Sequence, residues 1–412
     1  MLVQALVVNL TPPLFIPLRT VFGFSFEQLG RLALLNFTTQ VVVELVGGPL
    51  VDRFGARVFA LLSQLLVFTG LWLFAWSDHL FATAYTGMMV ATLVFSAGGG
   101  MTELLLTPII NALPSERKAA DMNMLHSFYA TGQFTTVLLT SLAVVVLGAP
   151  WRLVVMVWSL MPLFAFIGFS RTFLPNLMQE ERRQRLRELV RLPLFHAMLV
   201  GIFLAGATEV AVAQWISAFA EKGLGLPKLL GDIGGCCLFA VMLGAGRVWM
   251  GLRTTAIDMR RVLTVSCGIA IGAYLVASLA PWPWLSLAAC VMSGLGVSLL
   301  WPGITVLAAR HFPRGGASMF ALLAAAGALG CAVAPWLVGM AADAIAVYPA
   351  TPALLAHIGL TIRPEPFGLR AGLLMAVVFP VLMLAVIRWI MRHPANEPTA
   401  NRLPSDAFLE RK

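Results

Sequence analysis

Charged residues are scarce in this chain of 412 amino acids, of which Asp, Glu, Lys and Arg make up 11%. Soluble globular domains carry about 25%, so the scarcity excludes a protein that only water surrounds. Hydrophobic residues account for 59% of the chain, which predicts a polytopic membrane protein. The formal net charge is +9, but the cations lie in short segments between apolar runs. Membrane topology therefore explains them better than a nucleic-acid partner, which we do not expect.

Several kinds of functional motif are also missing. The five cysteines follow neither a disulfide framework nor a zinc-binding pattern, and we interpret them as small packing residues. No nucleotide-binding loop of the Gly-x-x-x-x-Gly-Lys-Ser/Thr type occurs, so the energy for any transport must come from an ion gradient. No nucleophile–base pair or metal-ligand cluster indicates an enzyme. We therefore expect no enzymatic activity, no cofactor and no metal.

Apolar runs dominate what is present, and twelve of them predict helices that cross a bilayer, for which about 20 residues suffice. Their expected bounds are 2–18, 29–50, 58–76, 81–111, 122–148, 152–170, 195–220, 233–252, 262–281, 285–309, 317–342 and 371–391. The sequence therefore predicts an all-α membrane protein with twelve transmembrane helices.

The strongly charged segment 171–194 divides these runs into two groups of six. We expect it to be a cytoplasmic linker between an N-terminal half, 1–170, and a C-terminal half, 195–391, with a cytoplasmic tail, 392–412. Its arginines can lie on anionic headgroups, which makes membrane lipid a partner, although a solvated helix explains the segment equally well.

The cations are distributed unevenly between the two sides of this topology. With the amino terminus inside, 21 of the 28 Lys and Arg residues fall on the cytoplasmic side. This number includes Arg247, which we count with the loop after the eighth run. The positive-inside rule then places both termini in the cytoplasm and the protein in the cell membrane.

The turn between the second and third runs carries the most specific motif of the chain. It reads Gly48-Pro-Leu-Val-Asp52-Arg53-Phe-Gly55-Ala-Arg57. Gly48 removes a side chain where two helices would touch, and Gly55 permits a backbone turn that other residues avoid. The order of residues resembles the loop 2–3 signature of the major facilitator superfamily of transporters.

This resemblance implies two pseudo-symmetric six-helix halves that open to each side of the membrane in turn. It also implies a cytoplasmic gate formed by Gly48, Asp52, Arg53, Gly55 and Arg57. Asp52 would lie beside the amino-terminal end of helix 11, where the helix dipole favours an acid. Arg53 and Arg57 would pair with nearby acids when the cytoplasmic side is closed.

The fifth run carries a narrower resemblance. Asn123-Met-Leu-His126-Ser-Phe and the following Gly132 are similar to the fucose–galactose–glucose permease group of the superfamily, as are Gln214-Trp215 and Trp301-Pro302. The resemblance implies proton-coupled uptake of a sugar. Symporters of this group usually carry an acid in helix 1, where this chain offers Asn9, and a Gly-Pro pair in helix 5, where it has Phe134-Thr135-Thr136.

Three acids, Glu44, Glu103 and Glu209, lie well inside the predicted spans. Each costs about 2.5–3.5 kcal/mol at a helix centre on insertion scales, so a function in substrate or ion coupling is the first reading. Glu103 follows three glycines, Gly98 to Gly100, which let a ligand or backbone approach closely. The alternative for each is a structural acid hydrogen-bonded to a neighbouring helix.

Polar residues form stripes on two helices. Asn36, Gln40 and Glu44 recur every four residues and share one face, while Asn123, His126 and Gln133 form a second stripe. His126 is a candidate for gating or for a hydrogen bond between helices. Trp215 and Trp301 are candidates for stacking on a sugar or for ordinary packing. The residues expected to line a central cavity are Asn9, Asn36, Gln40, Asn123, His126, Gln133, Gln214, Trp215 and Trp301.

These observations predict a monomeric secondary transporter that couples uptake of a small sugar or similar polar solute to protons, with sodium as the other candidate ion. An exporter of drugs or amphipathic metabolites is one alternative. A non-transporting membrane receptor with the same fold is another.

Overall fold

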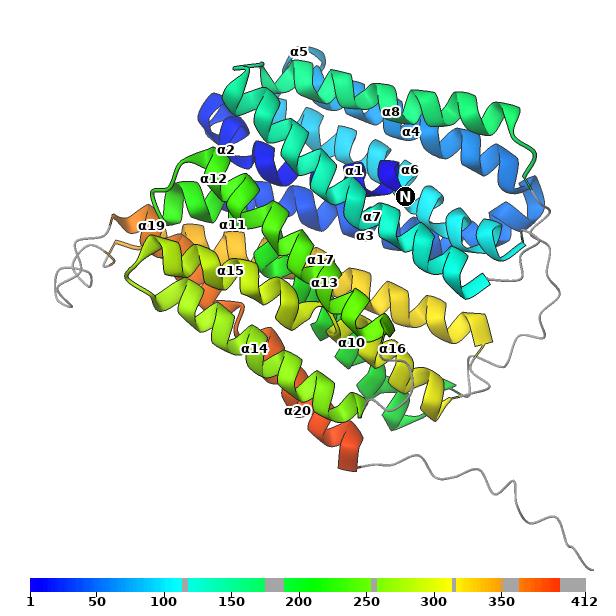
Figure 1. Cartoon of the computed structure of the whole chain (residues 1–412). Helices are drawn as coiled ribbons and strands as arrows, with labels where there is room; N and C mark the ends of the chain where they lie inside the picture. Colours follow the sequence, from blue (N-terminus) through cyan, green and yellow to red (C-terminus); the bar gives the residue numbers. More distant parts are fainter. Residues whose placement is uncertain are drawn as a thin grey trace, which may run out of the picture.

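The computed structural model describes residues 1–112, 118–174, 189–252, 258–312, 316–349, 351 and 363–392. All regular elements in these ranges are helical, and they form two groups (Figure 1). Most elements up to α8 lie in the upper part of that view and most elements from α10 onward lie in the lower part, while α12 reaches up beside α2.

The first group contains six spans, three of which are divided or accompanied by short elements. Its helices are α1 (Leu2–Asn9), α2 (Thr11–Phe22), α3 (Phe26–Phe54), α4 (Ala56–Ala75), α5 (Ser77–Leu80), α6 (Ala84–Ala112), α7 (Lys118–Ser141), the π-helix η1 (Leu142–Val146) and α8 (Trp151–Arg171). The break between α1 and α2 falls just before Pro12 and Pro13, which occupy the first turn of α2. Proline is tolerated there because the first amide groups of a helix have no partner within it.

The second group also contains six spans. Its helices are α10 (Pro193–Ala213), α11 (Ile216–Ala218), η2 (Phe219–Gly223), α12 (Lys228–Leu230), η3 (Gly231–Cys237), α13 (Leu238–Leu252), α14 (Met259–Leu279), α15 (Pro283–Val297), α16 (Leu300–His311), α17 (Gly316–Val347), α19 (Pro364–Met375) and α20 (Val378–Arg392). α10, α11 and η2 follow one another as one span, as do α12, η3 and α13.

Eleven helical stretches in the described ranges are long and apolar enough to cross a membrane. The shorter apolar stretch Thr131–Val146 supplies the twelfth. The prediction of an all-α polytopic protein with twelve spans is therefore confirmed.

Several predicted boundaries differ from the structure by four or more residues, and two of them have a clear local reason. α3 continues through the motif to Phe54, and α4 begins at Ala56, so the expected turn consists of Gly55 alone, at φ 84°. The last span begins at Pro364 rather than at 371, because Pro364 and Pro366 fit the first turn of a helix.

The bundle has two ends, which we name after two turns. The Gly23 end holds the turn between α2 and α3 and the start of α6, α8, α12, α15 and α19; the Gly55 end holds the turn between α3 and α4. At the Gly23 end, Ser25 and Gln28 form a reciprocal capping box at the start of α3. This cap fixes where α3 begins. The connection from the end of α2 at Phe22 to the start of α3 at Phe26 is therefore short.

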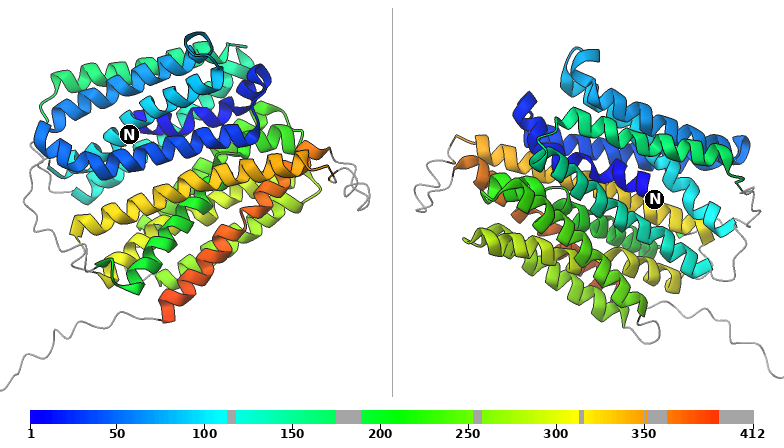
Figure 2. Two further views of the ribbon diagram at one scale, coloured as in Figure 1. Left: turned by 180° about the vertical axis from the view of Figure 1, so that it is seen from behind. Right: turned by 45° about the horizontal axis from the view of Figure 1, so that its top comes forward.

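The two groups of helices are bonded to each other near the Gly23 end. Trp336 Nε1 donates to Glu27 Oε1 at 2.9 Å, and the Glu27 amide donates to Asp343 Oδ2. These bonds join α17 to α3, which lie side by side in both views of Figure 2. Ser141 Oγ donates to Asp232 Oδ2 at 2.7 Å and joins α7 to η3.

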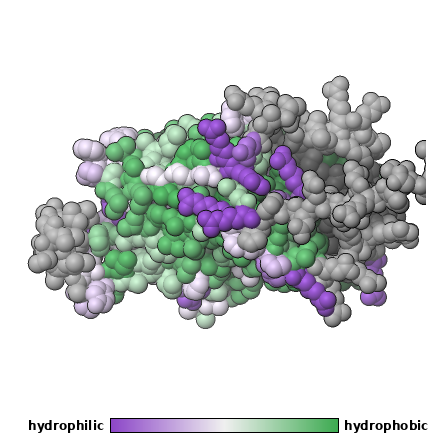
Figure 3. All heavy atoms as spheres, turned by 90° about the horizontal axis from the view of Figure 1, so that it is seen from below, coloured by the Kyte–Doolittle hydropathy of each residue, from purple (hydrophilic) through white to green (hydrophobic). Residues whose placement is uncertain are grey.

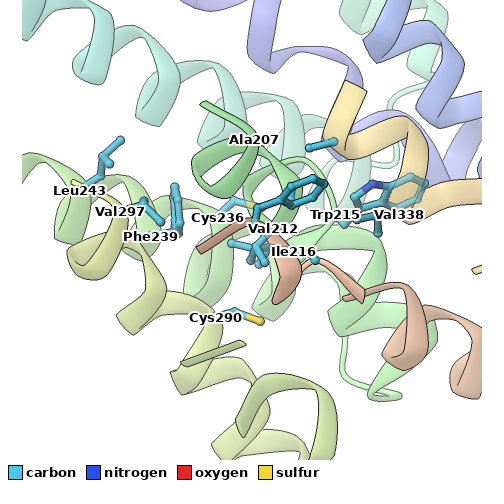
Figure 4. Close-up of a cluster of buried hydrophobic side chains, with 14 of the residues drawn as sticks. Ala207, Val212, Trp215, Ile216, Cys236, Phe239, Leu243, Cys290, Val297 and Val338 are labelled. Atoms are coloured by element: carbon cyan, nitrogen blue, oxygen red, sulfur yellow. The ribbon is translucent and has the colours of Figure 1, made fainter. Parts of the chain in front are cut away.

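Packing differs between the interior and the outer face. Figure 4 shows a cluster of buried side chains in the second group, including Trp215, Phe239 and Val338. Figure 3 shows the outer face that carries α14 and α20: hydrophobic residues cover much of it, and polar residues gather where α14 begins and α20 ends. An apolar belt with charge near its margin is the surface that a bilayer requires.

Candidate functional site

Three successive glycines bring α6 into contact with three other helices. A side chain on Gly98 would collide with the Ser63 carbonyl in α4, one on Gly99 would lie 2.8 Å from Val7 in α1, and one on Gly100 would lie 2.9 Å from the Gln40 Cα in α3. Successive residues of an α-helix point about 100° apart. Of the two expected functions, close approach of a ligand and close approach of a backbone, the glycine run therefore serves the second.

A chain of hydrogen bonds joins α1, α3 and α6 beside these glycines. Gln4 Nε2 donates to Gln40 Oε1 at 2.6 Å, and Gln40 Nε2 donates to Asn36 Oδ1 at 2.6 Å. Ser96 Oγ donates to the same Asn36 oxygen at 2.9 Å. Asn36 and Gln40 are each 4% exposed. In this structure they hold helices together, and a role in lining a cavity stays a prediction.

Glu44 and Glu103 follow this network by one helical turn on α3 and α6. Glu44 lies four residues after Gln40, and Glu103 lies three after Gly100, so both carboxylates project beyond the Gln40–Gly100 contact toward the Gly55 end. Both are partly exposed and they interact electrostatically. Among the described residues, neither carboxylate has a hydrogen bond or an ion pair within 4 Å; the nearest compensating charge of Glu103 is the amino-terminal ammonium of Met1, which interacts with it over a longer distance. The structure thus brings two of the three predicted acids together.

Glu209 of α10 has a counterion that the sequence analysis misplaced. Arg247 Nη2 lies 3.2 Å from Glu209 Oε1 and 3.1 Å from Oε2. Arg247 belongs to α13, not to a cytoplasmic loop, and its Nε donates to the Ser298 carbonyl at 3.4 Å. The error arose because a count of loop charges assigned every cation near a span end to the loop. Glu209 is a lone acid in the seventh span, and because a buried acid usually has a counterion, it could have indicated a cation in a neighbouring span.

Trp301 lies beside this ion pair. It is one turn after Ser298, its ring contacts Gly327 of α17, and the Gly327 carbonyl in turn contacts Gly206, one turn before Glu209. Both contacts are too close for a side chain on either glycine. The predicted residues Glu209 and Trp301 are therefore neighbours in the second group of helices.

Gln214 and Trp215 lie elsewhere, nearer the Gly23 end. Trp215 is fully buried, and its Nε1 donates to the Pro335 carbonyl at 3.0 Å. Its ring packs against Phe15 and Phe26, with centroid distances of 5.2 and 5.7 Å. Gln214 is 4% exposed. In this state Trp215 is a contact between the two groups of helices rather than an exposed lining residue.

The remaining predicted lining residues belong to α1 and α7. Asn9 donates to the Ala5 carbonyl at 3.0 Å and lies 3.5 Å from the Tyr129 hydroxyl. Tyr129, which the sequence analysis did not select, lies near both Glu103 and Glu209. Gln133 is 9% exposed. The side chains of Asn123 and His126 lie outside the described residues.

The expected gate residues surround the turn at Gly55, which has the positive φ predicted for it. Arg57 donates to the Ser170 carbonyl, and the Arg53 guanidinium lies 5.3 Å from the Phe54 ring. The acid partners expected for these arginines are not among the interactions of the described residues. The surroundings of Gly48 and the side chain of Asp52 lie outside what the structure describes.

A fourth acid, Asp232, is fully buried in η3 and was missed because it precedes the predicted eighth span. Lys228 Nζ lies 3.1 Å from its Oδ2 and also donates to Ser217 Oγ at 3.1 Å. The spacing of four residues between Lys228 and Asp232 was the signal that could have found the pair. In the described ranges, no group of three or more His, Cys, Asp or Glu residues could hold a metal ion.

Solved structures of transporters share this fold. The chain superposes with a TM-score of 0.75 on a bacterial homolog of the human lysosomal transporter Spinster in an inward-facing, occupied conformation, at 14% identity and covering 95% of this chain and 94% of that one. A D-xylose–proton symporter gives 0.72 at 17% identity, covering 92% and 94%. The fucose–proton symporter of E. coli gives 0.60 at 16% identity, covering 94% and 96%. At these identities the likeness concerns the fold alone.

Sequence comparison identifies the family. Among curated proteins none matches this chain. The family model of the Major Facilitator Superfamily matches residues 1–335, which is most of the chain. Together with the twelve spans, this match shows that the chain is a transporter rather than an enzyme, and that it belongs to the Major Facilitator Superfamily.

Proposed function

We propose that this transporter couples the uptake of a small polar solute, such as a sugar, to the movement of protons, with Glu103 as the coupling acid. The observation that carries the proposal is the state of Glu103: a partly exposed carboxylate in a transmembrane helix, beside Glu44, with no hydrogen bond and no side-chain cation within 4 Å among the described residues. The one opposite charge that interacts with it is the more distant amino-terminal ammonium of Met1. Asn36, Gln40 and Ser96 next to it are hydrogen-bonded to one another. A carboxyl group without such a bond is free to exchange a proton with water.

Two features support Glu103 over the other acids. Glu209 is paired with Arg247, and Asp232 is paired with Lys228, so their charges are already compensated. Glu103 is also nine residues from the end of α6 at Ala112, about 13 Å along the helix, which puts it inside the span. An unpaired carboxylate at that depth is costly, and such groups commonly mark proton relays.

The distribution of cations supports an orientation in which the Gly55 end faces the cytoplasm of a cell membrane. In that orientation the bonds at the Gly23 end close the outer side, and the state is inward-facing. Transport then requires the bonds between the two halves to break and re-form in each cycle.

A proteoliposome assay tests the coupling role. A mixture of labelled sugars and sugar acids is supplied outside vesicles that hold the purified protein, with and without an imposed pH gradient. Glu103→Gln should abolish gradient-driven accumulation but retain exchange of solute down its own gradient, because glutamine cannot carry a proton. Asp258→Asn is the matched control, since it also neutralises a carboxylate but keeps the cap at the start of α14. Undiminished accumulation by Glu103→Gln would remove the assignment.

A further inference from the structure

Arg247 is a cation inside a membrane helix, and it is open to solvent on one side. Its side chain is 42% exposed, and that of its partner Glu209 is 20% exposed. An arginine that faced hydrocarbon would cost about 2.5–3.5 kcal/mol on insertion scales. The pairing with Glu209 on α10 and the bond to the Ser298 carbonyl direct the guanidinium toward the interior of the second half instead. We conclude that the exposed part of the pair faces a watery space.

The pairing leaves part of the guanidinium unused. Both Glu209 oxygens share one nitrogen, Nη2, whereas a fully engaged arginine fork gives each oxygen its own nitrogen. Nε is occupied by the Ser298 carbonyl. Among the described residues nothing accepts a hydrogen bond from Nη1. Nη1 can therefore bind an oxygen of a second carboxylate, and the whole edge of Nη1 and Nη2 becomes available when Glu209 leaves.

An aromatic residue, Trp301, lies in the same part of the second half. Trp301 follows Ser298 by one turn, and its ring rests on Gly327, close to Gly206 and thus to the turn of α10 that carries Glu209. The ring is partly exposed. A guanidinium with an indole ring in the same region suits a small solute that has a carboxylate at one end and C–H groups along its chain.

We propose that Arg247 binds the carboxylate of the transported solute, and that Glu209 occupies the guanidinium while the carrier is empty. The solute class is a polyhydroxy monocarboxylate, such as a sugar acid. One guanidinium compensates one negative charge, which favours a monocarboxylate over a dicarboxylate. This inference rests on the proposed function, because it names the kind of polar solute that the transporter carries.

Equilibrium binding to the purified full-length protein tests the inference without any proton gradient. The melting temperature is measured at fixed pH and salt against D-gluconate, D-galactonate and D-glucuronate, each compared with its neutral parent, D-glucose or D-galactose. At least one acid should stabilise the protein at lower concentration than its neutral parent. Arg247→Gln should weaken binding of that acid about 10- to 100-fold, the effect of losing a charge-assisted bond.

Two further variants separate binding from folding. Glu209→Gln removes the competing carboxylate and should bind the acid more tightly, about tenfold or more. A variant that merely failed to fold could not do this. Arg260→Gln, which removes an exposed cation at the start of α14, should leave binding unchanged.

The proposal is overturned if neutral sugars stabilise the protein as well as their acids do, if none of the acids stabilises it, or if Arg247→Gln binds the acid with unchanged affinity. Failure of the coupling proposal looks different. In that case Glu103→Gln accumulates solute normally, while the pattern of acid binding at Arg247 is unaffected.

Discussion

Asn36 uses each of its polar atoms to hold three helices together. Its Oδ1 accepts from Gln40 and from Ser96, and its Nδ2 donates to the Val7 carbonyl at 2.8 Å. Water cannot replace these partners easily, because the side chain is 4% exposed. The residue therefore contributes to stability through three bonds at once.

Replacing this amide tests the network. Asn36→Leu keeps the volume but leaves the Gln40 amide and the Ser96 hydroxyl without their acceptor, so we expect a loss of about 1–3 kcal/mol of stability. The melting temperature of the purified protein should fall. Thr69→Val is the control, because the Thr69 hydroxyl bonds only to carbonyls of its own helix. Equal melting temperatures for the two variants would show that the network contributes little.

The sequence predicted that three polar residues share one face of α3, but it did not show which of them form hydrogen bonds to other helices. Asn36, Gln40 and Glu44 recur every four residues, which identifies one face of α3. Their partners, Gln4 and Ser96, come from distant parts of the chain, and only the fold shows that they reach the first two residues and not Glu44. Arg247 was misplaced for the same reason, since its partner Glu209 lies 38 positions away.

At the scale of elements, one residue makes the hairpin of α3 and α4. Gly55 has φ 84°, and both neighbouring residues are helical. With ψ 148°, this backbone lies outside the left-handed helical region and close to a region that is essentially restricted to glycine, where other residues pay about 1–3 kcal/mol. Glycine at this position therefore allows two long helices to pack as neighbours with a connection of a single residue.

A pair of glycine substitutions with opposite expected signs tests this explanation. Gly55→Ala should destabilise the protein by about 1–3 kcal/mol, although nothing lies within 4 Å of the added methyl group, because only the backbone is strained. Gly168→Ala in α8 also meets open space but has helical backbone, and it should stabilise by about 0.4–1 kcal/mol. Thermal unfolding of both variants gives the signs. A stabilising Gly55→Ala would refute the role of the turn.

The motif around Gly55 shows which features of an element its sequence reveals. The positive φ was predictable, because it depends on one glycine between two helices. The length of the turn was not, because Asp52 and Arg53 are as compatible with the last turn of a helix as with a loop, and α3 continues to Phe54. Boundaries of this kind depend on packing against other helices.

At the scale of the whole molecule, apolar runs suffice to predict the twelve spans, but they do not show which state the bundle adopts. That state depends on the contacts between halves at the Gly23 end, where Ser141 donates to Asp232 and Trp336 to Glu27. Every residue in these contacts has to serve both the closed and the open arrangement. A single sequence therefore carries no pattern that singles out one of them.

The bond from Ser141 to Asp232 offers a way to shift the balance between states. Ser141→Ala removes a hydrogen bond to a charged group but leaves Asp232 paired with Lys228, so no buried charge loses its counterion. A bond of this kind contributes about 1.5–3 kcal/mol, which corresponds to roughly a tenfold or larger change in the ratio of open to closed molecules at the Gly23 end.

Distances between labels on the two halves measure that ratio. Leu80→Cys and Trp282→Cys place labels on exposed residues of the Gly23 end, and the five native cysteines are buried, so the introduced thiols react first. Ser141→Ala should increase the population with a long label separation. Ser170→Ala, which breaks a bond within α8 only, should not. If the two distributions coincide, the Ser141–Asp232 contact does not hold the halves together, and closure at this end depends on the packing of α3 against α17.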